Sequence, residues 1–104
     1  MKLSVFDRIV LLNILPKEGN FATLKIIRKL REDLSFDEAE NKALDFQFEE
    51  NGQVKWRTDA DIIKDVQIGE KANDIIIDSL KELDKQKKLK DQHYSIYEKF
   101  VGEP

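Results

Sequence analysis

The residue of this chain with the most obvious capacity for chemistry is His93, its only histidine, a residue type that serves in acid-base catalysis and metal binding. It falls on the apolar face of a helix predicted over residues 92–101, together with Ile96 and Phe100. A lone histidine on such a face is usually packed, with one ring nitrogen hydrogen-bonded, and we predict that role here. No Gly-x-Ser-x-Gly turn, Gly-x-Gly-x-x-Gly loop or phosphate loop occurs. We therefore expect no enzymatic activity, no cofactor and no small-molecule substrate.

A metal site is also not expected from the sequence. The chain has no cysteine, which excludes disulfides, thiolate nucleophiles and thiolate metal ligands. Acidic residues at positions 59, 61, 65 and 70 match positions 1, 3, 7 and 12 of a calcium-binding loop. The match fails at position 6, where the required turn-making glycine is Lys64, and at position 5, where Ile63 has no ligand atom. We interpret this stretch as a polar connection followed by a helix start.

The composition is that of one folded domain spanning residues 1–104. The chain is 40% hydrophobic and 38% charged, with only four glycines and two prolines, which favours an ordered chain with few loops. Asp7 and Arg8 interrupt the apolar run that a secretion signal needs, and no segment approaches the ~20 apolar residues of a membrane span. We expect a cytoplasmic protein that contacts no membrane. A net charge of −3 provides no general attraction to nucleic acid.

A β-hairpin is predicted around the loop Glu50-Asn51-Gly52. A two-residue loop would place the apolar residues of the two strands on opposite faces. A three-residue loop, with Gly52 in a left-handed conformation, places them all on one face. This register pairs Phe48 with Val54 and Phe46 with Trp56, and leaves Gln47 and Lys55 on the other side. The apolar face needs a helical layer to cover it, so we predict that all four apolar residues are buried together.

Helices are predicted over residues 5–15, 21–34, 36–44, 70–88 and 92–101, with N-caps at Ser4, Asn20, Ser35 and Asp91. Ser35 and Glu38 have the spacing of a capping box. Residues 58–61 could cap a further helix, whereas residues 64–68 alternate like a third strand, so this region is left open. The element order predicts an α+β fold in which helices pack on a small antiparallel hairpin or three-stranded sheet.

Two helices carry more apolar surface than one core requires. The helix over residues 5–15 is apolar nearly all round, so it is either the central element of the fold or part of an interface. In the helix over residues 70–88, three successive isoleucines cannot all face one core. Exposed apolar patches usually mark partners, so we predict binding to another protein or to a second copy. The candidate interface residues are Val5, Leu11, Leu12, Ile75 and Ile77.

The order helix, helix, short capped helix, hairpin, long helix resembles the winged-helix arrangement of bacterial regulators. The segments 9–15, Gly19 and 26–31 are similar to the opening of the PadR regulators. That resemblance implies that the third helix reads the major groove, that the hairpin is the wing, and that a long C-terminal helix dimerises. The candidate DNA contacts are then Lys25, Arg28, Lys29, Lys55 and Arg57.

The region that should face DNA departs from this pattern. Residues 35–50 contain six acidic residues and one lysine, a net charge of −5, which would repel phosphates. The chain as a whole also resembles small phage- or prophage-encoded proteins through the segments 15–21 and 97–102, which implies an accessory protein without an assigned activity. Our leading interpretation is a non-enzymatic protein-protein interaction module that can form oligomers. The alternative is a winged-helix DNA-binding transcriptional regulator.

Overall fold

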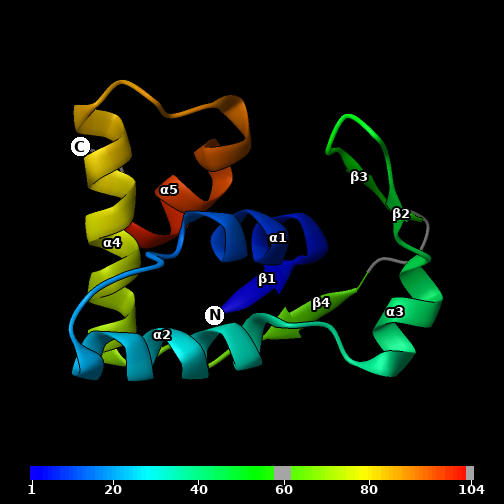
Figure 1. Ribbon diagram of the computed structural model, residues 1–104, viewed down its shortest axis with the longest axis horizontal. Coiled ribbons are helices and arrows are strands. Elements are labelled where there is room, and N and C mark those ends of the chain that lie inside the picture. Colours follow the sequence, from blue (N-terminus) through cyan, green and yellow to red (C-terminus); the bar gives the residue numbers. More distant parts are fainter. Residues whose placement is uncertain (58–61, 103–104) are drawn as a thin grey trace.

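The computed structural model describes residues 1–57 and 62–102. The fold is α+β, as predicted, with five α-helices and two separate antiparallel sheets of two strands each in these residues (Figure 1). The helices are α1 (Val5–Ile14), α2 (Phe21–Leu34), α3 (Glu38–Leu44), α4 (Glu70–Lys85) and α5 (Tyr94–Phe100), and a 3-10 turn, η1 (Asp91–His93), precedes α5. The strands are β1 (Lys2–Ser4), β2 (Gln47–Phe48), β3 (Val54–Lys55) and β4 (Ile63–Asp65).

Helix α1 is the central element of the fold, the first of the two alternatives left open by the sequence. It begins with the predicted cap, because the Ser4 hydroxyl accepts from the Asp7 N–H and the Asp7 carboxylate accepts from the Ser4 N–H. β1, α2, α4 and α5 all contact α1, which Figure 1 shows in the middle of the molecule. The core that they enclose consists of Leu3, Val10, Leu11, Leu15, Ile27, Leu30, Leu34, Val66, Ile76, Leu80, Ile96 and Phe100.

Helix α4 packs one apolar face against this core and ends earlier than the predicted residue 88. Ile76 and Leu80 are fully buried, and the neighbouring isoleucines are half-buried against the same core. The helix stops at Lys85 because Lys87 takes a left-handed conformation, with φ of 58°. The N–H groups of Lys87 and Lys88 then donate back to the carbonyls of Asp84 and Leu83, which is a Schellman ending without a glycine.

The expected third strand exists as β4, but it does not join the hairpin. It pairs instead with β1, a strand that the sequence did not predict, and Leu3 lies opposite Lys64. A strand of three residues is too short to show an alternating pattern in the sequence. Its central residue, Leu3, is fully buried in the core. The three-stranded alternative is therefore wrong. Residues 58–61, where a further cap was considered, lie outside the described residues.

Helix α3 begins two residues later than predicted. Asp37, not Ser35, is the N-cap, and it forms the capping box with Glu40. Ser35 instead ends α2, since its hydroxyl donates to the Arg31 carbonyl. Both residues are followed three positions later by a glutamate, so the sequence spacing alone could not distinguish them. Of the apolar residues of α3, Leu44 is buried whereas Ala39 and Ala43 are exposed.

The hairpin has the predicted register. Phe48 pairs with Val54 and Gln47 with Lys55, and Gly52 has a positive φ of 86°. The predicted common burial is wrong for Phe48, whose side chain is 80% exposed. Figure 1 shows the reason, because α1 and α3 lie against the base of the hairpin and its tip extends beyond both helices.

Candidate interaction surfaces

The apolar side of the hairpin forms a continuous surface that is packed at one end and exposed at the other. We call it the hairpin face and define it by Phe6, Phe46, Phe48, Val54 and Trp56. The Trp56 ring lies between Phe6 and Phe46, with ring centroids 6.3 Å from each. Phe46 and Trp56 are half-buried, Phe6 is 42% exposed, and exposure reaches 80% at Phe48. Aromatic contacts therefore run from Phe6 through Trp56 to Phe46, and the exposed ring of Phe48 lies two residues further along the same strand face.

The base of this surface is held by a buried arginine. The Arg8 side chain is fully buried, and its guanidinium donates to both carboxylate oxygens of Glu40, at 2.6 and 3.2 Å. It also donates to the carbonyls of Leu34 and Ser35. The guanidinium carbon lies 4.0 Å from the centroid of the Phe36 ring, which is in edge contact with Phe46. The hydrogen bonds from Arg8 lower the pKa of Glu40 and keep it ionised.

Asp7, the neighbour of Arg8 in the sequence, forms a second ion pair in which the carboxylate is buried and the lysine is exposed. Asp7 is 2% exposed and accepts a hydrogen bond of 2.6 Å from Lys99 of α5. Burial by itself would raise the pKa of Asp7, but the hydrogen bonds from Lys99 and from the Ser4 N–H outweigh that effect and lower it. Sequence reasoning missed both pairs. The available signal was two adjacent charges inside a helix that is otherwise apolar nearly all round, since a buried charge requires a partner.

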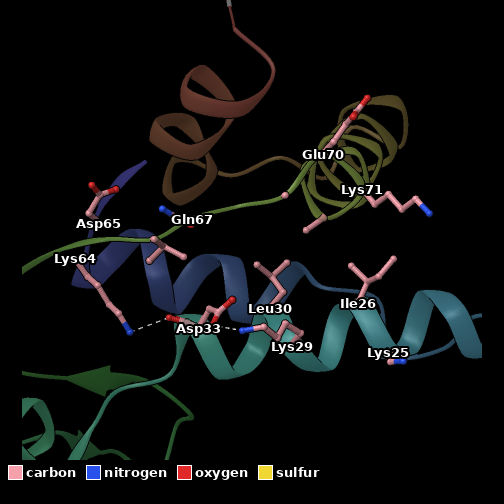
Figure 2. Close-up of a pocket in the computed structure, with 13 residues that line it drawn as sticks. Lys25, Ile26, Lys29, Leu30, Asp33, Lys64, Asp65, Gln67, Glu70 and Lys71 are labelled. Carbon is pink, nitrogen blue, oxygen red and sulfur yellow. Dashed lines mark hydrogen bonds and ion pairs between the residues drawn. The ribbon is translucent and has the colours of Figure 1, made fainter.

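A groove of about 950 Å³ lies between α2 and the start of α4. Figure 2 shows Ile26 and Leu30 pointing up from α2 toward the segment that leads into α4. Val66 and Ala72 complete an apolar floor. Charged side chains form the rim of the groove: Lys25, Lys29, Asp33, Lys64, Asp65, Glu70 and Lys71.

The rim carries an excess of positive charge. Lys29 pairs with Asp33 at 3.1 Å, and Asp65 pairs with the Met1 ammonium group at 3.0 Å. Within residues 1–57 and 62–102, Lys25 and Lys71 form no ion pair with a carboxylate. Lys64 donates to the backbone carbonyl of Asp33, and its charge also acts on Glu40. Glu70 is the one rim carboxylate left unpaired in that part of the chain. The start of α4 adds the positive end of a helix dipole.

His93 lies in a second hollow, between the end of α1 and the middle of α4, and its geometry confirms the predicted packed role. It is 6% exposed, and its Nδ1 accepts from the Lys90 N–H at 2.9 Å. Burial, aided by the charge of Lys90, lowers the pKa of His93, so the ring is neutral at physiological pH. Ser79 lines the same hollow, but its hydroxyl donates to the Ile75 carbonyl of its own helix. The two side chains therefore do not form a nucleophile-base pair.

The five candidate interface residues predicted from the two apolar helices pack into or against the core of the chain. Val5 and Leu11 are buried in the core of this chain, at 5% and 0% exposure. Leu12, Ile75 and Ile77 are half-buried and pack against that core. The two helices use their extra apolar residues to contact α2, α5 and β1, because α1 is enclosed on nearly every side.

The candidate DNA-contact residues do not form one surface. Lys25 and Lys29 lie on the groove and Arg28 on the exposed side of α2, whereas Lys55 lies on the hairpin and pairs with Glu49 at 2.9 Å. The Arg57 N–H donates to the Leu44 carbonyl, beside the base of the hairpin. Figure 1 shows α2 along the lower edge and the hairpin at the upper right.

Residues 1–57 and 62–102 contain no group of three or more His, Asp or Glu side chains placed to hold a metal ion. Asp59 and Asp61, from the calcium-like spacing, lie outside those residues. Among the described helices, none combines the length and the apolar character needed to cross a bilayer.

Comparison of the chain with protein-family models, with curated proteins and with solved structures gives no match.

Proposed function

We propose that this chain is a non-enzymatic interaction module that binds another protein chain through the hairpin face. The observation that carries this proposal is the 80% exposure of Phe48 at the end of a surface whose other aromatic rings pack on one another. Apolar patches rimmed by polar residues mark interaction sites on soluble proteins. Aromatic side chains are also the residues that contribute most strongly at protein interfaces.

The energetics of the hairpin support this role. An isolated two-stranded hairpin is at best marginally stable, and here only its base is covered by helices. A partner that covered Phe48 and Val54 would remove exposed apolar surface and would stabilise the complex by roughly 1.5–3 kcal/mol for each side chain fully buried. A partner that covers the exposed part of the hairpin would therefore stabilise it.

The charge around the hairpin face indicates what kind of partner fits. Asp45 and Glu50 are exposed beside it, and Glu49 forms an ion pair with Lys55. Complementary potentials favour association, so a partner surface with apolar side chains and unpaired lysines or arginines is expected.

Site-specific crosslinking tests the proposal. A photoreactive phenylalanine analogue is placed at position 48 and, as the matched control, at Tyr94, which is 70% exposed on α5. Irradiation of cells producing each variant should give a discrete protein adduct at position 48 and none at position 94. Adducts should disappear when Val54→Asp is added. Equal adduct patterns at both positions, or none at either, would show that the hairpin face is not an interaction surface.

A further inference from the structure

We infer that the groove between α2 and α4 receives the hairpin tip of a second copy of this chain, so that copies associate head to tail. This inference rests on the proposed function of the hairpin face and names its partner. The two surfaces are complementary in chemistry and cannot meet within one chain.

The groove has the chemistry of a receptor for an apolar segment with acidic neighbours. Its floor is formed by Ile26 and Leu30 of α2 with Val66 and Ala72, and it is open to solvent. Its volume of about 950 Å³ is within the range of pockets that bind small ligands. Lys25 and Lys71 stand on opposite sides of it, one from each helix, without carboxylate partners in the described residues (Figure 2).

The hairpin tip has the chemistry of the matching ligand. Phe48 is the most exposed phenylalanine but one, and Glu49 and Glu50 follow it directly. With Phe48 on the groove floor, these glutamates would lie next to the rim where Lys25 and Lys71 stand. Glu49, which pairs with Lys55 in the single chain, would then pair with a lysine of the groove. Lys55 is exposed, so water would solvate its charge after this exchange.

The positions of the two surfaces require two copies. Figure 1, viewed down the shortest axis of the molecule, shows the hairpin at the upper right and the junction of α2 with α4 at the lower left. A contact between two different surfaces is heterologous. It leaves one groove and one tip unused in every dimer, so further copies can be added to form a ring or an open chain.

Sedimentation velocity over a range of concentrations tests this arrangement. The wild-type chain should show a mass that rises beyond the dimer with concentration. Phe48→Ser should raise the dissociation constant about tenfold or more, as loss of a central aromatic contact does. Lys25→Glu with Lys71→Glu should do the same. Both lysines are exposed, and a glutamate in the first turn of α4 is favoured by the helix dipole, so these variants should fold normally.

Two variants serve as matched controls. Tyr94→Ser removes an aromatic ring that is 70% exposed from α5, and Lys81→Glu with Lys85→Glu makes the same charge change at the far end of α4. Both should associate as the wild type does.

Mixing the two defective variants is the decisive measurement. Phe48→Ser retains an intact groove and the double lysine variant retains an intact tip, so an equimolar mixture should form a 1:1 dimer that does not grow further. A mixture that stays monomeric would overturn the inference. Dimers of the double lysine variant alone would also overturn it, since they would show a hairpin-to-hairpin contact.

The outcome separates this inference from the proposed function. A wild-type chain that stays monomeric at high micromolar concentration overturns head-to-tail association. If position 48 still crosslinks to a different protein, the hairpin face remains an interaction surface. If position 48 crosslinks to nothing, both fail.

Discussion

The guanidinium of Arg8 binds both carboxylate oxygens of Glu40 and thereby joins the first turn of α1 to the first turn of α3. Arg8 is fully buried and Glu40 nearly so, with 14% of its side chain exposed. The same guanidinium stacks on Phe36, which contacts the hairpin through Phe46. The position of the hairpin on the helical body therefore depends on a charge inside the protein.

Removal of this arginine should be among the most damaging single changes. Arg8→Ala removes the cation that pairs with Glu40 and the donor to two backbone carbonyls, and loss of one partner of a buried ion pair typically costs about 3–5 kcal/mol. Urea unfolding followed by circular dichroism measures the change. Glu38→Ala is the matched control, because Glu38 forms only an exposed pair with Lys42 and should cost at most about 1 kcal/mol. Equal effects of the two substitutions would contradict this account of Arg8.

The buried carboxylates should make the protein sensitive to acid. The pKa values of Asp7 and Glu40 are both lowered in the folded chain, from 3.8 and 4.5. Each contributes stability that is fully present above its unfolded pKa and is lost as the pH falls through the lower folded pKa. Asp7→Asn should cost roughly 1.5–3 kcal/mol at pH 7, because it weakens a charged hydrogen bond to Lys99. Unfolding measured at descending pH should show this difference shrinking below pH ~4; a constant difference would be evidence against it.

His93 should add a second pH dependence at milder acidity. Its pKa is lowered below 6.5 in the folded state, so the unfolded chain binds a proton first as the pH falls. Stability should therefore decrease from about pH 6.5 down to the folded pKa and then level off. In His93→Gln the glutamine cannot be protonated, so the decrease in stability between about pH 6.5 and the folded pKa should be absent. An unchanged curve in that variant would exclude His93 as its source.

The two ends of the hairpin face should differ in their contribution to stability. Trp56 is half-buried between two phenyl rings, so Trp56→Ala should cost about 2 kcal/mol, less than the 3–5 kcal/mol of a fully buried tryptophan. Phe48→Ala should stay within about 0.5 kcal/mol because the ring is exposed. Urea unfolding measures both. Native tryptophan fluorescence as red-shifted as that of the unfolded chain would contradict the packing of Trp56.

Specific binding to duplex DNA is not expected. The winged-helix resemblance would place α3 against DNA, but its N-cap Asp37 and its first-turn residues Glu38 and Glu40 are acidic, and acids near phosphates remove the attraction on which binding depends. Electrophoretic mobility assays in physiological salt should show no shift at sub-micromolar protein. A shift that disappears after neutralisation of Lys55 and Arg57 would instead support the winged-helix alternative.

Local sequence signals predicted the elements of this fold well. The caps at Ser4 and Asn20 and the hairpin register depend on neighbours within a few positions, so the sequence contains the information that determines them. The strand β1 and the start of α3 were missed, because the first has only three residues and the second had two equally spaced capping signals. The predicted N-cap at Asp91 is also wrong, because Asp91–His93 forms a 3-10 turn and α5 begins at Tyr94.

The candidate surfaces were harder to predict, since they depend on how elements meet. Apolar periodicity marked Leu11 and Ile75 as interface residues, but contacts from α2, α5 and β1 bury or cover them. Phe48 was assigned to the core, because a strand pattern shows which face is apolar and not how far the covering helices extend. The lysines of the groove come from α2, β4 and α4, which no local pattern brings together.

The pairing of β1 with β4 has a consequence for the order of folding. Leu3 lies opposite Lys64, and everything from α1 to the hairpin falls between them. Closing so long a loop loses chain entropy before the contacts between the two strands can form and offset the loss. Contacts of this kind therefore form late in folding. We expect α1 and α2 to dock first and Leu3 to complete the core afterwards. The rate of global unfolding would then depend on how often this short strand pair separates.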